Sequence, residues 1–211
     1  MKLTEHITKS GHRIAIYDDL FEFNERMFLL DRCRRLPFEF SEGYDALLNE
    51  GSSGYTCKSV IEPQTLQHYK FVSPGHNGPT NIRHLSGIFP LHKEEFKNVW
   101  QEVGTRQMHR MWVNACHIAD NPKFHSDEPA EGPKSMLIYL NMKWDTNWDG
   151  GTAFKSADGV DIEYYVEYKP GRLVFFDSII PHKAMTPSAD APAYRFTFNT
   201  IWIPKDYEGP R

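Results

Sequence analysis

Alternation of apolar and polar residues dominates the second half of the chain and predicts a series of short β-strands there. Pairs that favour turns, such as Asn121-Pro122, Asp158-Gly159 and Pro170-Gly171, separate the runs. The strand-like runs lie at 110–118, 135–142, 152–155, 162–168, 171–176 and 194–202. Many short strands at this spacing are typical of an antiparallel sandwich or barrel.

The first half of the chain contains the helical patterns. Residues 20–35 are followed by Pro37, and 92–103 form a second amphipathic stretch. The apolar positions expected to face the core are Phe23, Met27, Leu30 and Cys33 in the first helix, and Phe96, Val99, Trp100 and Val103 in the second. With further strands expected at 12–17 and 55–61, the prediction is an α+β domain with a mainly β core, supported from outside by N-terminal helices.

The stretch 63–90 is rich in Pro, Gly, His and Asn, and it contains no clear periodicity. A loop this long inside a compact domain is usually functional. We expect it to be a lid or specificity loop. The segment 128–134 is the other candidate for selecting a substrate.

Length and charge narrow the functional classes. The chain has 211 residues and a formal net charge of −4, which fits one domain: 1–109 would hold the helices, strands and lid loop, and 110–203 the core. The balance of charge speaks against binding nucleic acid through its phosphates. The three cysteines form no CxxC pair, and no apolar run is long enough to span a membrane. The charged N-terminus has no apolar leader, so a cytoplasmic location is expected.

His125-Ser126-Asp127 is the strongest candidate for metal binding. In an extended backbone, residues i and i+2 point to the same face about 6.6 Å apart, so an imidazole and a carboxylate can converge on one ion. His182, which follows the strand 171–176, is the best candidate for a second imidazole. Two histidines and one carboxylate form the facial triad of non-haem Fe(II) enzymes, although a catalytic zinc site accepts the same ligands.

The final strand, 194–202, predicts a site for a buried anion. Alternation places Arg195, Thr197 and Asn199 on one face, and Phe196, Phe198, Thr200 and Trp202 on the other. An Arg that leads a polar inner face suits a carboxylate, because its guanidinium donates two parallel hydrogen bonds. The hydroxyl of Tyr139 could join the same anion. A register shift of one residue would turn Arg195 outward, and Arg172 would then be the alternative.

Taken in order, these motifs resemble the Fe(II)/2-oxoglutarate-dependent dioxygenases of the prolyl-4-hydroxylase-like branch. The matching elements are His125-x-Asp127, Tyr139-Leu140-Asn141 with Trp144 and Trp148, Gly150-Gly151, the segment 170–176, His182 with Pro187, and Arg195 leading to Trp202. Thr152, after the glycine pair, departs from the Glu or bulky apolar residue of many relatives.

The resemblance implies a double-stranded β-helix, or jelly roll, with Fe(II) held by His125, Asp127 and His182. It also implies that 2-oxoglutarate binds the iron and places its distal carboxylate on Arg195 and Tyr139. Thr197 and Asn199 could line that pocket. The implied reaction uses O₂, releases succinate and CO₂, and hydroxylates a C–H bond. Relatives that halogenate lack a carboxylate at the position of Asp127, which favours hydroxylation here.

Several alternatives remain open. One is a metal-dependent β-barrel isomerase, lyase or cofactor-free dioxygenase, in which Arg195 would bind the substrate itself. Another is a ligand-binding relative without catalytic activity. Among substrates, a small polar metabolite or amino acid, anionic ones included, is favoured over a protein, with peptidyl-proline hydroxylation as the alternative.

Overall fold

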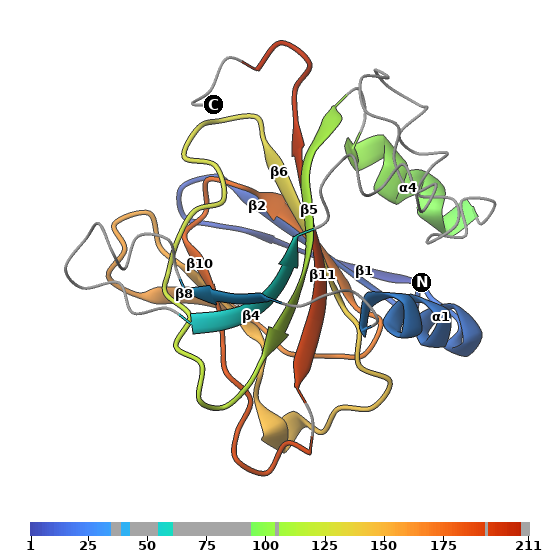
Figure 1. Ribbon diagram of the computed structural model, residues 1–211. Coiled ribbons are helices and arrows are strands. Elements are labelled where there is room, and N and C mark those ends of the chain that lie inside the picture. The colour runs from blue at the N-terminus through green and yellow to red at the C-terminus, as the bar shows by residue number, and fades with distance from the viewer. Residues whose placement is uncertain (35–38, 43–54, 61–93, 104–105, 193, 208–211) are drawn as a thin grey trace.

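Two antiparallel β-sheets, one large and one small, face each other in the computed structural model, and the helices lie outside the large sheet (Figure 1). The structure describes residues 1–34, 39–42, 55–60, 94–103, 106–192 and 194–207. The large sheet has the strand order β1-β2-β9-β6-β11-β5-β4-β3, and the small sheet has the order β10-β7-β8.

The strands of the large sheet are β1 (Lys2–Ile7), β2 (Arg13–Asp18), β3 (Glu39–Glu42), β4 (Tyr55–Val60), β5 (Gln107–Cys116), β6 (Lys134–Tyr139), β9 (Leu173–Asp177) and β11 (Arg195–Ile203). Those of the small sheet are β7 (Thr152–Lys155), β8 (Ile162–Val166) and β10 (His182–Ala184). The helices are α1 (Phe23–Arg34), α4 (Glu94–Val103) and the short 3₁₀ turn η2 (Thr146–Trp148). Every strand run expected from alternation is present, with ends shifted by a few residues. The strands β1, β3 and β10 were not expected, because each is short or largely polar.

Each face of the large sheet has its own apolar layer. The face toward the helices contributes Met111, Val113, Phe198 and Trp202, which pack with Leu29 and Cys33 of α1 and with Val99 and Val103 of α4. The opposite face contributes residues such as Leu137 and Tyr139, which pack with Phe154 and Val166 of the small sheet. The prediction of a β core supported from outside by helices is therefore confirmed.

The apolar face predicted for the first helix is wrong in part. Phe23 and Met27 are 59% and 49% exposed, whereas Leu29 and Cys33 are buried and Leu30 is partly buried. Because Met27, Phe28, Leu29 and Leu30 are consecutive apolar residues, more than one stripe of this helix could have faced the core. Packing against the large sheet buries the stripe that contains Leu29 and Cys33.

The second helix agrees with its prediction at the side chains that are described. Val99 and Val103 of α4 are buried. The side chains of Phe96 and Trp100 lie outside the described residues, as does the predicted lid loop 63–90. Within the described part of the chain, no helix combines the length and apolar character needed to cross a membrane.

Candidate metal and oxyanion site

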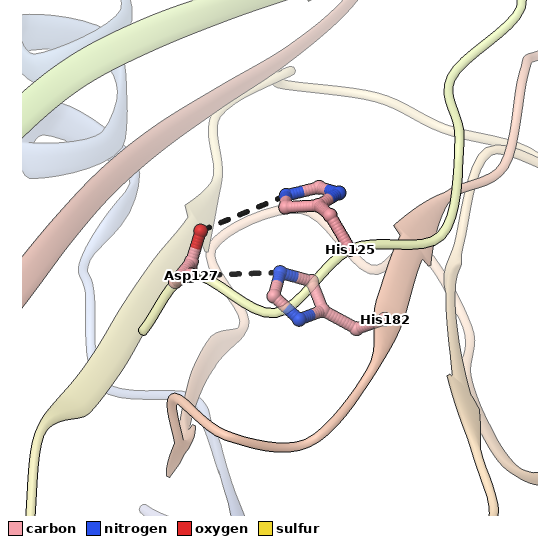
Figure 2. A group of neighbouring side chains, drawn as sticks. All are labelled: His125, Asp127 and His182. Carbon is pink, nitrogen blue, oxygen red and sulfur yellow. Dashed lines mark ion pairs between the residues drawn. The ribbon is translucent and has the colours of Figure 1, made fainter. Parts of the chain in front are cut away.

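The three side chains predicted to bind a metal lie together beside the apolar layer between the sheets. Nε2 of His125 is 3.6 Å from Oδ1 of Asp127, and Nε2 of His182 is 3.5 Å from Oδ2 of the same carboxylate (Figure 2). One ligand atom from each residue lies within 4.8 Å of the others. These separations are long for hydrogen bonds but suit ligands that share one ion at about 2.1 Å from each.

Backbone pairing brings the two histidines together across 57 positions of sequence. The N–H of His125 donates to the carbonyl of His182 over 3.0 Å, and the reverse bond is 2.8 Å. His182 opens β10, where its partner in the sheet register is Phe154 of β7. The aromatic rings of Phe154 and Phe176 pack against the His182 imidazole. The small sheet thus fixes the distal histidine.

Both imidazoles are oriented by carbonyl groups behind them. Nδ1 of His125 lies 3.0 Å from the Lys123 carbonyl, and Nδ1 of His182 lies 2.9 Å from the Ile180 carbonyl. Because a carbonyl oxygen can only accept, each Nδ1 carries the proton and each Nε2 keeps its lone pair. Burial lowers the pKa of His182, which favours its neutral form. Both rings are therefore prepared to act as ligands.

Asp127 is held as a carboxylate. The Ser135 hydroxyl donates to Oδ2 over 2.6 Å, and the Asp127 N–H donates to the Ser178 carbonyl. Burial by itself would raise the pKa of Asp127, but the neighbouring histidines and the Ser135 hydrogen bond outweigh it and lower the pKa to about 2. The donor set of two neutral imidazoles and one carboxylate fits Fe(II).

Arg195 begins β11 and is 1% exposed. Its Nε donates to the Gly150 carbonyl, and its terminal nitrogens lie 3.3–3.5 Å from the Gly151 carbonyl and from the Thr152 and Thr197 hydroxyls. All these partners are neutral, and no carboxylate of the described residues pairs with the guanidinium. A buried positive charge without a counter-ion fits an anion-binding pocket.

The glycine pair next to Arg195 has a steric role. Gly150 has φ +80°, and a Cβ there would lie 3.0 Å from the Trp144 ring. A Cβ on Gly151 would lie 2.4 Å from the Tyr165 ring and from the Val166 carbonyl. Only glycine lets this segment approach both β8 and Arg195 so closely.

The other residues predicted for the oxyanion pocket share the Arg195 face. Tyr139 is fully buried; its hydroxyl lies 2.8 Å from that of Thr152, and its ring lies 5.4 Å from the Arg195 guanidinium carbon. Thr197 and Asn199 are buried on the same strand face, and the Asn199 amide donates to the Thr197 carbonyl over 3.1 Å. The alternation predicted for 194–202 is confirmed, since Phe198 and Trp202 face the helices.

Arg172, the alternative anion partner, already forms an ion pair with a carboxylate of this chain. Its Nε and a terminal nitrogen lie 2.8 and 3.0 Å from the two carboxylate oxygens of Asp18. The Arg172 guanidinium is therefore engaged in a two-point ion pair with Asp18, outside the Arg195 pocket. His117, which directly follows β5, is exposed.

Sequence reasoning missed two residues of the site. Ser135 contacts Asp127, and Thr152 lies between Tyr139 and Arg195. Strand alternation places Ser135 on the same face as Tyr139, which is a usable signal. Thr152 carried no such signal, because its contacts with Tyr139 and Arg195 arise only where the small sheet packs against the large one.

Comparison with known proteins agrees with this geometry. Residues 106–203 match the model of the 2OG-Fe(II) oxygenase superfamily, and this segment contains all the candidate site residues. A search of the curated proteins returns no match.

Several solved structures share the fold. A prolyl-4-hydroxylase of Pseudomonas putida is 19% identical over 93% of this chain and 95% of its own, with a TM-score of 0.58. HygX of Streptomyces hygroscopicus, with nickel and 2-oxoglutarate bound, is 9% identical over 94% and 85%, with a TM-score of 0.60. A Trichoplax adhaerens prolyl hydroxylase in complex with a hypoxia inducible factor peptide is 15% identical over 90% and 83%, with a TM-score of 0.54.

These neighbours confirm the predicted double-stranded β-helix. The matched superfamily uses Fe(II), 2-oxoglutarate and O₂, which confirms the expected cofactors at the level of the superfamily. The core of this chain, residues 106–203, is therefore similar to the 2OG-Fe(II) oxygenase superfamily.

Proposed function

We propose that this oxygenase is a hydroxylase, which replaces an unactivated C–H bond of its substrate by C–OH. One observation carries the proposal. A metal-ligand set of two imidazoles and a carboxylate shares the space between the sheets with a buried Arg195 that has no carboxylate partner among the described residues. A metal and a dicarboxylate can therefore be held side by side.

In this proposal Fe(II) is bound by Nε2 of His125, Nε2 of His182 and the Asp127 carboxylate. The hydrogen bonds at the two Nδ1 atoms fix the ring orientations before the metal arrives. A facial triad leaves three coordination positions for 2-oxoglutarate and O₂. Side-chain exposure differs within the triad: His125 is 55% exposed, whereas Asp127 and His182 are each 9% exposed. The open side at His125 is where we expect substrate to approach.

The distal carboxylate of 2-oxoglutarate would bind Arg195, with the Tyr139 and Thr152 hydroxyls beside it. Thr197 and Asn199 would form the wall of this pocket. Thr152 contacts Arg195, and Phe154, two residues later, is the register partner of His182. Two residues of strand span about 6.6 Å, which is on the scale of a five-carbon diacid.

When bound, iron, 2-oxoglutarate and O₂ supply the oxidising chemistry, with succinate and CO₂ as the other products. The protein binds and orients the reactants and keeps bulk water out with the Phe154 and Phe176 rings against His182. The carboxylate of Asp127 favours hydroxylation, because it fills the position that is vacant in halogenating relatives.

We propose a small, polar, anionic substrate. Peptidyl-proline hydroxylation is the second candidate, because three of the structures with this fold are named prolyl hydroxylases. A metal-dependent isomerase or lyase is the third, and it differs from both in having no requirement for 2-oxoglutarate.

The decisive experiment is an anaerobic titration of the metal-free protein with Fe(II) and then with 2-oxoglutarate, followed by visible absorption. We expect a charge-transfer band that requires both additions, and succinate formation once O₂ is admitted. Stoichiometric metal binding without this band would contradict the proposal and favour the isomerase or lyase. Arg195 would then anchor the substrate.

A further inference from the structure

Register across three neighbouring strands places Arg110 on the metal side of the large sheet. In β11, Ile201 lies opposite Ser135 of β6 and opposite Arg110 of β5. Directly opposite residues of antiparallel strands point to the same face. Ser135 touches Asp127, so Arg110 lies in the same row as a contact of the metal site, two strand spacings or about 10 Å from Ser135.

Packing on the two sides of β5 supports this orientation. Met111 and Val113 join the apolar layer beneath the helices, whereas Trp112 packs with Ile201 and Ile203 in a separate cluster. Trp112 is the register partner of Asn199, which belongs to the proposed cosubstrate wall. The even-numbered residues of this part of β5 therefore face the site.

Arg110 and Trp112 form a shelf on that face. The guanidinium carbon of Arg110 lies 5.2 Å from the centre of the Trp112 ring, and Trp112 is 8% exposed. Arg110 itself is exposed, and within the described part of the chain it forms no ion pair with a carboxylate. A guanidinium that lies over an aromatic ring keeps its N–H edge available for a two-point contact with an oxyanion.

Glu128, the acidic residue that follows Asp127, already has two partners within the protein. Oε2 of Glu128 accepts a hydrogen bond from the Tyr207 hydroxyl over 3.1 Å, and Oε1 lies 3.7 Å from Nε2 of His109. Tyr207 also packs against the cluster of Trp112, Ile201 and Ile203. These contacts orient the Glu128 carboxylate toward Tyr207 and His109.

We propose that the Arg110–Trp112 shelf binds a carboxylate of the substrate and so places the rest of that molecule toward the metal. The inference rests on the proposed function and names a substrate class for it, an organic acid with a carboxylate some 10 Å or less from the carbon that reacts. It assigns to Arg110 a role separate from that of Arg195, which would bind the cosubstrate.

The test uses the Zn(II)-loaded protein saturated with 2-oxoglutarate, so that added anions cannot enter the Arg195 pocket. Benzoate and benzamide, which differ in charge but little in shape, are titrated while the Arg110 Nε–H and Trp112 indole N–H resonances are followed by NMR. We expect benzoate to shift both resonances in a saturable manner and benzamide to leave them in place. In Arg110→Ala, the affinity read from Trp112 should fall by at least about tenfold.

Arg32→Ala is the matched control, because Arg32 lies over the Phe28 ring at 5.1 Å on α1 and is distant in sequence from the site. This variant should bind benzoate like the wild type. No benzoate shift up to about 100 mM, equal shifts from benzamide, or full affinity in Arg110→Ala would each overturn the proposal. A stronger response to inorganic phosphate than to benzoate would overturn the carboxylate assignment.

Succinate formation by the wild-type Fe(II) enzyme is measured in parallel, without added substrate and with ascorbate as the two-electron reductant. Its absence would count against the proposed function, whereas the NMR titration depends only on the shelf. The two failures are thereby distinguished.

Discussion

The Ser135 hydroxyl lies 2.6 Å from Oδ2 of Asp127 and 2.8 Å from the Ser178 hydroxyl. Ser135 and Ser178 are almost completely buried. Because the carboxylate can only accept, the Ser135 proton points to Asp127 and the Ser178 proton is free to point to Ser135. This chain of hydroxyls restrains one carboxylate oxygen before a metal binds.

Removal of the Ser135 hydroxyl should weaken metal binding. We expect Ser135→Ala to lower the affinity for Fe(II) or Zn(II) by about 10- to 100-fold, because the carboxylate loses its orienting donor. Calorimetric titration of the metal measures this. Ser135→Thr, which keeps a hydroxyl, should retain most of the affinity. Ser188→Ala, whose hydroxyl binds the Asn147 carbonyl instead, is the control; equal affinity in Ser135→Ala and this variant would show that the hydroxyl has no such role.

Loss of a triad side chain should abolish turnover and preserve the fold. His182→Ala and Asp127→Ala remove a proposed ligand, so neither variant should bind Fe(II) at wild-type stoichiometry or form succinate. Circular dichroism checks the fold. His117→Ala, which changes an exposed histidine, should behave like the wild type. Succinate formation at the wild-type rate in either triad variant would refute the assignment.

Two buried or half-buried arginines should separate cosubstrate binding from stability. Arg195→Ala should raise the KM for 2-oxoglutarate by about 100-fold or more, because the distal carboxylate loses a desolvated charge partner. Arg172→Ala should lower stability through its lost contact with Asp18 and leave that KM nearly unchanged. Steady-state kinetics against 2-oxoglutarate and urea unfolding give the two readouts. The reverse pattern would mean that Arg172, rather than Arg195, binds the cosubstrate.

The Asp18–Arg172 pair should make stability depend on pH in acid. Burial by itself would raise the pKa of Asp18, but the hydrogen bond and charge of Arg172, aided by Lys169, outweigh it and lower the pKa. A carboxyl pKa that is lower in the folded than in the unfolded state stabilises the protein above the unfolded value of about 3.9, and this contribution disappears as the pH falls through the folded value.

Asp18→Asn should therefore cost about 1–3 kcal/mol of unfolding free energy at pH 7. The difference from wild type should shrink below about pH 4, where the carboxyl of the unfolded chain begins to take up a proton, and should disappear as the pH falls through the lower pKa of the folded carboxyl. Urea unfolding of both proteins at several pH values measures this. A difference that stayed constant down to pH 3 would indicate that the charge of Asp18 is not what stabilises the contact.

Much of the site could be predicted because strand alternation is local. The two-residue period placed Arg195, Thr197 and Asn199 on one face, and the sheet keeps that register between β11 and β6. Helix α1 shows the limit of such reasoning. Its apolar residues allow several buried stripes, and the choice of Leu29 and Cys33 depends on the surface against which the helix packs.

The sequence by itself determined the β-rich class, the candidate ligands His125, Asp127 and His182, and the inward face of β11, because spacing and period are properties of neighbouring residues. Only the tertiary structure decided that Ser135 donates to Asp127, that Asp18 forms an ion pair with Arg172, and that Arg110 lies in register with Ser135 across β11. These relationships join strands far apart in the chain, and the pairing that creates them depends on the packing of the whole domain.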